Sequence, residues 1–142
     1  MELRQITDIA VSGLRAQRAR MATAASNIAN ADTTRTAEGG PYQRRDPVFR
    51  ATALENGSFQ GRLDRALRQV DVPRIVADKG APIERFLPGH PDADEAGMVA
   101  FPRVNVIEEM TRVMNASRSF EANLAVMRKV RAMGEATMRI GR

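Results

Sequence analysis

The sequence has no cysteine, no tryptophan and one histidine, and Phe, Tyr and Trp together make up 4% of its 142 residues. Without cysteine there is no disulfide framework, thiolate zinc site, iron–sulfur cluster or cysteine nucleophile. The single imidazole, His90, leaves little for metal binding or for a serine hydrolase, which needs a histidine beside its nucleophile. No glycine-rich phosphate loop ending in Lys-Ser or Lys-Thr occurs, which excludes an NTPase. We therefore expect no catalytic residue, no cofactor and no metal.

Long apolar runs are also missing. No stretch approaches the roughly 18 uncharged apolar residues that a membrane helix needs. The first eight residues are too polar for the apolar core of a cleavable signal peptide. We expect neither a transmembrane segment nor conventional secretion.

Arginine is in excess. It supplies 20 of the 22 basic residues, and the formal net charge is +5. The charge is +3 over residues 1–50, −2 over 51–100 and +4 over 101–142. Because acidic residues interleave the arginines, solvated helix faces explain the pattern better than a nucleic-acid footprint does. A coiled-coil nucleic-acid-binding regulator remains the alternative function, since arginine on two helices can neutralise phosphates.

Two long helices are predicted, one at each end of the chain. Residues 104–133 contain neither proline nor glycine, which indicates one helix that begins soon after Pro102. The N-terminal segment has the same spacing of apolar residues and predicts a helix over about residues 4–30. Alanine, serine and glycine make up much of its stripe, so a partner helix must approach closely. Asn30 is expected to end this helix in a left-handed conformation.

The C-terminal helix is expected to carry a stripe of residues at alternating steps of four and three. The stripe comprises Val106, Met110, Val113, Ser117, Phe120, Leu124, Met127, Arg131, Gly134 and Met138. Glu108 and Glu109 lie in the first turns, where negative charge complements the helix dipole. We interpret these two carboxylates as structural and not catalytic.

The middle of the chain follows a different pattern. Gly39–Pro41 breaks any helix, and residues 42–49 are a short extended candidate. Val70 and Val72 alternate as in a half-buried strand. Five of the seven prolines lie in residues 73–102, which excludes a long helix there. We expect a small strand-and-loop module of low regularity.

The predicted fold is mainly α: long N- and C-terminal helices pair as an antiparallel coiled-coil-like unit, with a small irregular β/loop module in the middle. The helices form a discontinuous domain of residues 1–36 and 103–142, and the module comprises residues 37–102. Two helices alone bury one stripe each, which makes a poor core. The sequence therefore predicts an assembly subunit.

One acidic loop, residues 92–103, has part of the pattern of a calcium site. Asp92 and Asp94, with Gly97 at the sixth position, fit such a loop, but Ala96 at the fifth position and Arg103 at the twelfth do not. An acidic, proline-rich loop before a helix is the favoured interpretation. A small metal-dependent enzyme is thus the weakest functional alternative.

Several motifs resemble the bacterial flagellar rod and hook protein family. Residues 25–36, Ala-Ser-Asn-Ile-Ala-Asn-Ala-Asp-Thr-Thr-Arg-Thr, resemble its N-terminal signature. Residues 38–49, and residues 89–94 leading into 104–110, narrow the resemblance to the proximal-rod members. Residues 116–123 look like the shared C-terminal motif.

The resemblance implies a structural subunit of the flagellar basal-body rod and not an enzyme. Such a subunit assembles helically through its terminal helices and transmits torque from the ring to the hook. The implied partners are copies of itself, other rod proteins, basal-body ring and adaptor proteins, and the flagellar type III export apparatus, without nucleic acid. The implied location is the rod in the periplasmic space, reached without a cleaved signal peptide.

The residues expected at the assembly interface lie on the two helical stripes and in the signature motif. They are Leu14, Met21, Ser26, Asn27, Ile28, Asn30, Met110, Val113, Phe120, Asn123, Leu124 and Met127. The small residues of the motif would permit close helix approach, and its Asn side chains would bond to backbone or to neighbouring subunits. Phe120, the only aromatic residue on the long stripe, is expected to be buried against the N-terminal helix or an adjacent subunit. We also expect the terminal helices of a dilute monomer to be frayed and to order on assembly.

Overall fold

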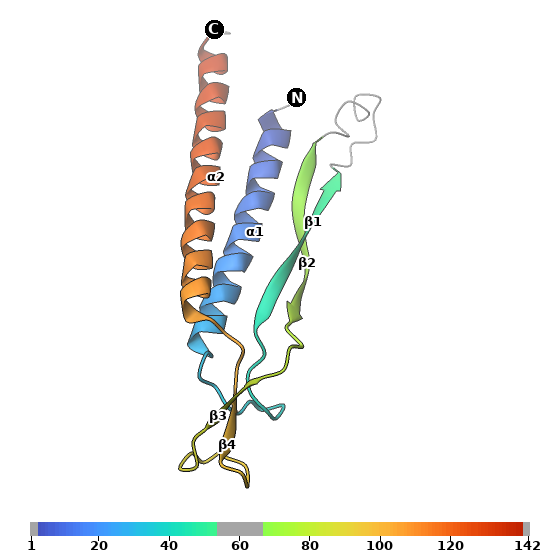
Figure 1. Ribbon diagram of the computed structural model, residues 1–142. Coiled ribbons are helices and arrows are strands. Elements are labelled where there is room, and N and C mark those ends of the chain that lie inside the picture. Colours follow the sequence, from blue (N-terminus) through green and yellow to red (C-terminus); the bar gives the residue numbers. More distant parts are fainter. Residues whose placement is uncertain (1–2, 54–66, 141–142) are drawn as a thin grey trace. The chain divides into compact units, whose positions relative to one another are not determined.

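The computed structural model describes residues 3–53 and 67–140 of the chain (Figure 1). In chain order the elements are α1 (Leu3–Ala29), β1 (Arg45–Ala53), β2 (Arg68–Ala77), β3 (Ile83–Phe86), β4 (Met98–Phe101) and α2 (Val106–Ile140). A mainly α fold with a small antiparallel β module between two terminal helices is thereby confirmed. Neither helix, over the residues described, combines the length and apolar character needed to cross a membrane.

Helix α1 lies within one residue of its predicted bounds. At its end the Asn30 backbone N–H and side-chain Nδ2 both donate to the Ser26 carbonyl, at 3.1 and 2.9 Å. Asn30 Oδ1 accepts a hydrogen bond from Thr33 Oγ1 at 3.2 Å. The predicted left-handed conformation of Asn30 is wrong, because no described residue other than glycine has a positive φ. The amide side chain satisfies the helix end itself, so a left-handed residue is not needed there.

Helix α2 begins after Pro102, as predicted, and continues without a break for 35 residues. Asn105 caps it, because its Oδ1 accepts hydrogen bonds from the backbone N–H groups of Ile107 and Glu108 at 3.1 and 3.3 Å. A side-chain acceptor at this position satisfies N–H groups that have no partner inside the helix. The cap fixes where α2 starts, and so fixes the position of Glu109 one turn later.

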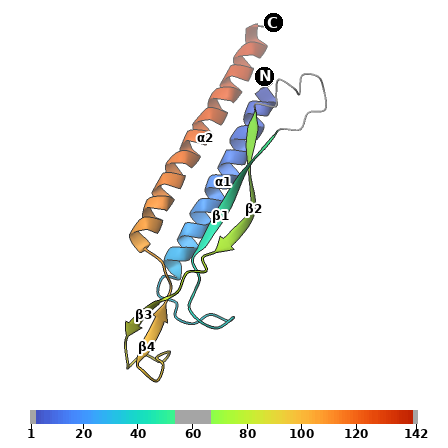
Figure 2. The ribbon, with the colours of Figure 1, turned by 45° about the vertical axis from the view of Figure 1, so that its right-hand side comes forward.

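Strands β1 and β2 confirm the two extended segments expected in the middle of the chain. They form a two-stranded sheet and run in opposite directions beside α1 (Figure 1, Figure 2). Arg50 Nη2 and Asp71 Oδ2 form an ion pair of 3.1 Å between the strands. Ser12 Oγ accepts a hydrogen bond from the Val70 N–H at 3.0 Å, which joins β2 to α1.

Strands β3 and β4 form a second two-stranded antiparallel sheet, in which Ile83 pairs with Phe101 and Phe86 pairs with Met98. The sequence did not indicate this pair, because short strands between prolines leave little periodicity. The Val99 and Phe101 side chains of β4 are buried, whereas all of β3 is exposed. The strand-and-loop module is therefore more regular than expected.

By internal contacts the chain divides into two units, and each unit contains part of both helices. Unit 1 comprises Met1–Ala19, Val48–Arg74 and Asn115–Arg142, and unit 2 comprises Arg20–Pro47 and Ile75–Met114. The division into residues 1–36 with 103–142 and residues 37–102 stays a prediction.

Within unit 1, the two helices approach closely and run antiparallel. A Cβ atom on Gly13 would lie 3.0 Å from Asn123 Nδ2, and one on Gly134 would lie 3.6 Å from Leu3 Cδ1. The buried apolar residues of this unit are Ala10, Ala16, Ala116 and Val130. Small side chains therefore fill most of this interface, as the alanine-rich stripe of α1 predicted.

The buried residues of α2 do not coincide with the predicted stripe. At three places the buried residue is the one that immediately precedes a stripe residue. Glu109 in unit 2 and Ala116 and Val130 in unit 1 are buried, whereas Met110 and Arg131 are exposed. The physical reason is the close approach of the helices, which favours small residues over long ones on the packed side. Large apolar side chains of α2 consequently remain in contact with water.

Candidate functional site

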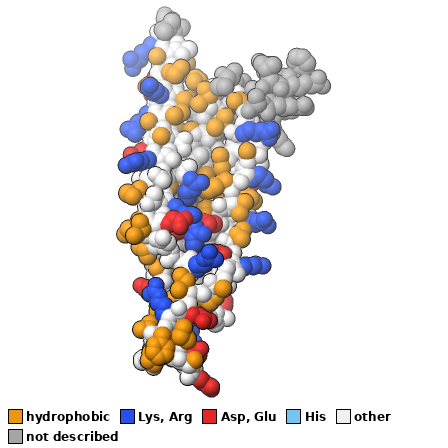
Figure 3. Space-filling view, viewed as in Figure 1, with side chains coloured by type: hydrophobic (Ala, Val, Ile, Leu, Met, Phe, Trp, Pro, Cys, Tyr) orange, Lys and Arg blue, Asp and Glu red, His pale blue; other side chains and the backbone are white. Residues whose placement is uncertain are grey.

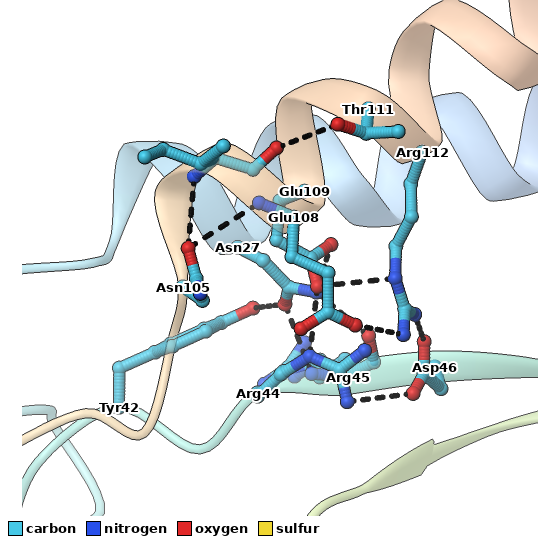
Figure 4. Close-up of polar contacts among 11 residues, drawn as sticks. Asn27, Tyr42, Arg44, Arg45, Asp46, Asn105, Glu108, Glu109, Thr111 and Arg112 are labelled. Carbon is cyan, nitrogen blue, oxygen red and sulfur yellow. Dashed lines mark hydrogen bonds and ion pairs between the residues drawn. The ribbon is translucent and has the colours of Figure 1, made fainter.

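Asn27, near the end of α1, is fully buried, with 0% of its surface exposed. Its Nδ2 donates to the Arg45 carbonyl at 2.8 Å and to Glu109 Oε2 at 3.1 Å. Its Oδ1 accepts from the Arg45 N–H at 2.9 Å and from the Tyr42 hydroxyl at 3.0 Å (Figure 4). All four hydrogen bonds that an amide side chain can make are thus formed. The Asn27 amide bonds to both the N–H and the carbonyl of Arg45, the first residue of β1, as the backbone of a neighbouring strand would.

Glu109, in the first turns of α2, is 1% exposed. Its Oε1 forms an ion pair with Arg44 Nε at 2.8 Å and approaches Arg112 Nε at 3.6 Å. Asp46 binds the same two guanidinium groups, Arg44 Nη1 at 2.8 Å and Arg112 Nη1 at 2.7 Å (Figure 4). We call Asn27, Tyr42, Arg44, Asp46, Glu109 and Arg112 the polar junction. It joins the end of α1, the chain entering β1 and the start of α2, and all its members belong to unit 2.

The charges of the polar junction compensate one another. Burial alone lowers the pKa of Arg44, but hydrogen bonding and attraction to Glu109 and Asp46 outweigh burial and raise it above its ordinary value. Arg44 therefore stays charged, and Glu109 has a cation beside it. Removing one partner of a buried ion pair costs about 3–5 kcal/mol, because an uncompensated charge stays behind. The polar junction thus makes the position of α2's first turn depend on the chain entering β1.

Tyr42, in the segment between α1 and β1, packs at the edge of the polar junction. Its hydroxyl lies 3.4 Å from Ser26 Oγ in addition to its bond to Asn27. The Arg45 guanidinium lies 5.7 Å from the centroid of the Tyr42 ring, within the range of a cation–π contact. The buried aromatic ring shields the hydrogen bonds of Asn27 from water, which strengthens them.

The acidic loop considered as a calcium site makes hydrogen bonds within the chain. Asp92 accepts from Thr34 Oγ1 at 2.7 Å and pairs with Arg35 at 3.4 Å. Asp94 Oδ1 accepts from the N–H groups of Ala96 and Met98, which shapes the turn into β4. Residues 3–53 and 67–140 contain no cluster of three or more His, Cys, Asp or Glu residues that could hold a metal ion.

Two family models match the helical ends of the chain. The model described as flagella basal body rod protein matches residues 8–35, and the model described as flagellar basal body rod FlgEFG protein C-terminal matches residues 95–140. The flagellar basal-body rod protein FlgC of Escherichia coli O6:H1 is 37% identical over 99% of both chains. Those of Borreliella burgdorferi (37%, over 94% of this chain and 93% of the relative) and Aquifex aeolicus (36%, over 96% of both) are also similar. The chain belongs to the FlgC family of flagellar basal-body rod proteins.

As a member of the FlgC family, the chain is a structural subunit of the flagellar basal-body rod and is not an enzyme. Its partners are other components of the basal body, and its location is the rod. Family membership does not support the nucleic-acid-binding alternative. Both family models cover members of the polar junction: Asn27 lies in the first matched range, and Glu109 and Arg112 lie in the second.

The structure places the predicted interface residues of this FlgC-family subunit unevenly. Asn27 is buried in the polar junction, and Met110 is exposed. The others are half-buried: Leu14, Met21, Ser26, Ile28, Asn30, Val113, Phe120, Asn123, Leu124 and Met127. Their role between subunits stays a prediction. The sequence did not identify Arg44, Glu109 and Arg112 as a cluster, although a Glu–Arg pair three residues apart in a helix was visible.

Proposed function

We propose that this subunit assembles helically through its terminal helices and transmits torque along the rod. The supporting observation is the set of large apolar side chains that α2 exposes to water: Val106, Ile107, Met110, Met114, Val126, Met133 and Met138. Scattered exposed apolar residues are ordinary, but Ile107, Met110 and Met114 are spaced three and four residues apart and share one side of the helix, which suits a surface that a partner covers. Figure 3 shows hydrophobic side chains at the outer edge of the first part of α2, and Lys and Arg side chains at that edge further toward the C-terminus.

We further propose that α1 and α2 pair as an antiparallel coiled-coil-like unit. In unit 1, the contacts Gly13–Asn123 and Leu3–Gly134 support this pairing, because the first helix advances as the second returns. In unit 2, the hydrogen bond between Asn27 and Glu109 supports it. Small residues on the packed sides permit the close approach that such a unit needs.

We propose that the polar junction holds the β1 segment at a fixed orientation to the helices while the subunit transmits torque. Apolar contacts between small side chains have no preferred direction. Hydrogen bonds and ion pairs, such as those of Asn27 and Arg44, have a fixed geometry. We therefore assign to the polar junction the role of fixing the angle at which the β1 segment leaves the helices.

We also propose specific partners and a specific location, which the family's structural role in the rod supports. They are copies of this chain, other rod proteins, basal-body ring and adaptor proteins, and the flagellar type III export apparatus. The proposed location is the periplasmic part of the rod, reached without a cleaved signal peptide. Immunogold labelling of purified basal bodies tests the location. Label confined to the cytoplasmic parts of the basal body would contradict it.

A double replacement, Met133→Gln with Met138→Gln, tests assembly through α2. Both side chains are largely exposed, so stability of the isolated chain should change by less than about 0.5 kcal/mol. Burial of each methionine between subunits is worth about 1.5–3 kcal/mol, so rod formation and swimming should be lost. The control is Asn115→Gln with Thr137→Gln, which changes exposed polar positions of the same helix. Normal swimming of the methionine variant at normal expression would contradict the proposal.

A further inference from the structure

Unit 1 contains an apolar groove between the two helices. It has a volume of about 780 Å³ and is lined by Leu3, Arg4, Thr7, Leu124, Met127, Arg128, Val130, Arg131 and Gly134. We call it the basic groove. Leu124, Met127 and Val130 come from one side of α2, and Leu3 comes from the first turn of α1. A Cβ atom built on Gly134 would lie 3.6 Å from Leu3 Cδ1, so a larger residue at position 134 would fill part of this space.

The rim of the basic groove is lined by three arginines. Arg4, Arg128 and Arg131 line it, and no acidic residue does. Arg4 and Arg131 have ion-pair partners on their own helices, at 4.0 Å to Asp8 and 3.2 Å to Glu135. Arg128 has no ion-pair partner among residues 3–53 and 67–140. An apolar floor with a cationic rim suits an apolar segment that carries acidic side chains.

Unit 2 exposes a segment with those properties at the start of α2. Ile107, Met110 and Met114 are 77%, 53% and 55% exposed, and we call these three residues the exposed patch. Their spacing of three and four residues places them on one side of the helix. Glu108, beside the exposed patch, has 56% of its side chain exposed and forms an ion pair of 2.7 Å with Arg112 of the same helix. The exposed patch therefore combines apolar side chains with an adjacent carboxylate.

We propose that the basic groove of one copy binds the exposed patch of a second copy. This inference rests on the proposed function, because it names the surfaces through which copies assemble. The lengths agree: the exposed patch spans eight residues, about 10 Å of helix, and the groove residues Leu124–Gly134 span about 15 Å. The charges agree as well, since Glu108 would meet the arginine rim. Groove-to-groove contact would instead bring two sets of three arginines together, which is unfavourable.

Contact between two different surfaces has a geometric consequence. Each copy uses its groove toward one neighbour and its exposed patch toward another, so the contact does not close on itself. Such a heterologous contact repeats along an open helical assembly, as a rod requires. A contact of one surface with itself would stop at a dimer.

The absence of cysteine from the sequence permits a direct cross-linking test with the full chain. Thr7→Cys places a thiol at the basic groove, and Thr111→Cys places one beside the exposed patch. Under mild oxidation, a mixture of the two variants should form a disulfide-linked dimer, and each variant alone should form at least about 10-fold less. Thr137→Cys, exposed on α2 outside the groove, replaces Thr111→Cys as the control and should give only the background yield.

A second pair of variants tests the chemistry of the contact. Met110→Lys in the Thr111→Cys chain removes apolar area and adds a positive charge opposite the arginine rim. The mixed dimer should fall about 10-fold or more, as expected from losing one buried methionine side chain. Ala125→Lys adds the same charge at an exposed position of α2 that belongs to neither the groove lining nor the exposed patch, and it should leave the yield unchanged.

Three outcomes would overturn the inference. They are a mixed dimer no more abundant than the control, a dimer of Thr7→Cys alone in equal yield, and capture of Thr7→Cys only by another basal-body protein. Failure of the proposed function looks different. In that case the Met133→Gln and Met138→Gln variant swims normally, whatever the cross-linking shows.

Discussion

Replacing Asn27 by aspartate exchanges a donor group for an acceptor at the centre of the polar junction without changing the size of the side chain. The wild-type Nδ2 donates to the Arg45 carbonyl and to Glu109 Oε2, at 2.8 and 3.1 Å. An ionised carboxylate can donate to neither. Asn27→Asp therefore leaves the buried Arg45 carbonyl without a donor and brings two carboxylates into contact.

The cost follows from these two distances. Two unit charges 3.1 Å apart repel by about 5 kcal/mol at an effective dielectric constant of about 20. A buried carbonyl without its donor costs about 1–3 kcal/mol more. Arg44 and Arg112 offset part of the repulsion. We expect Asn27→Asp to lower the free energy of unfolding by about 3–5 kcal/mol at pH 7.

The loss should depend on pH with a definite sign. In the unfolded chain the new carboxyl has a pKa of about 3.9, and in the folded chain burial and the neighbouring carboxylate raise that pKa. Below about pH 4 the group is protonated in both states, and the charge penalty is absent. As the pH rises above this value, folding must keep the group protonated or accept the repulsion, so the penalty grows.

Urea unfolding followed by circular dichroism, at pH 4 and pH 7, measures both effects relative to the unmutated chain. Asn115→Asp makes the same chemical change at an exposed position of α2 and should cost less than about 0.5 kcal/mol. A cost for Asn27→Asp below about 1 kcal/mol at pH 7, or one that is no larger at pH 7 than at pH 4, would refute the reasoning.

Three further changes test single contacts by the same unfolding measurement. Arg44→Lys keeps the charge but loses the planar group that binds Glu109 and Asp46 together, so we expect a loss of about 1–3 kcal/mol; an unchanged midpoint would contradict this. Gly97→Ala should lower the free energy of unfolding by about 1–2 kcal/mol, because Gly97 has a φ of 74°, which is unfavourable for alanine. This loss should be larger than the loss from a substitution at an exposed polar position. Ser12→Ala removes the acceptor for a β2 amide and should cost about 1–2 kcal/mol, with exchange of that amide proton accelerated.

The helices could be predicted from the sequence because their signals are local and long. Residues 104–133 have no helix breaker, and α2 starts four residues after Pro102. The precise buried line of α2 could not be predicted in the same way. A pattern of apolar residues indicates which side chains avoid water, and α2 turns only part of that pattern toward its own chain. Met110 belongs to the stripe and is exposed, whereas the adjacent Glu109 is buried.

The polar junction was predictable only at Asn27, whose motif indicated a side chain bonded to backbone. Glu109 lies 82 residues from Asn27 in sequence, and no local rule relates the two. A glutamate in the first turn of a helix normally faces solvent and complements the helix dipole, and the sequence indicates that role for Glu109. In the structure Glu109 is buried instead, because Arg44 and Arg112 supply the charge that makes burial of the carboxylate tolerable.

A buried ionic cluster is a costly way to hold a small protein together, because apolar residues of similar volume often stabilise as well or better. What apolar residues do not supply is a fixed direction. The apolar side chains that pack the helices in unit 1 are mostly Ala and Gly, which have no side-chain donor or acceptor of fixed direction. In unit 2, every donor and acceptor of Asn27 has a partner at a set position, and two guanidinium groups bind two shared carboxylates. A subunit that bears load gains from this arrangement, since twisting the connecting segment against the helices must break several short bonds together.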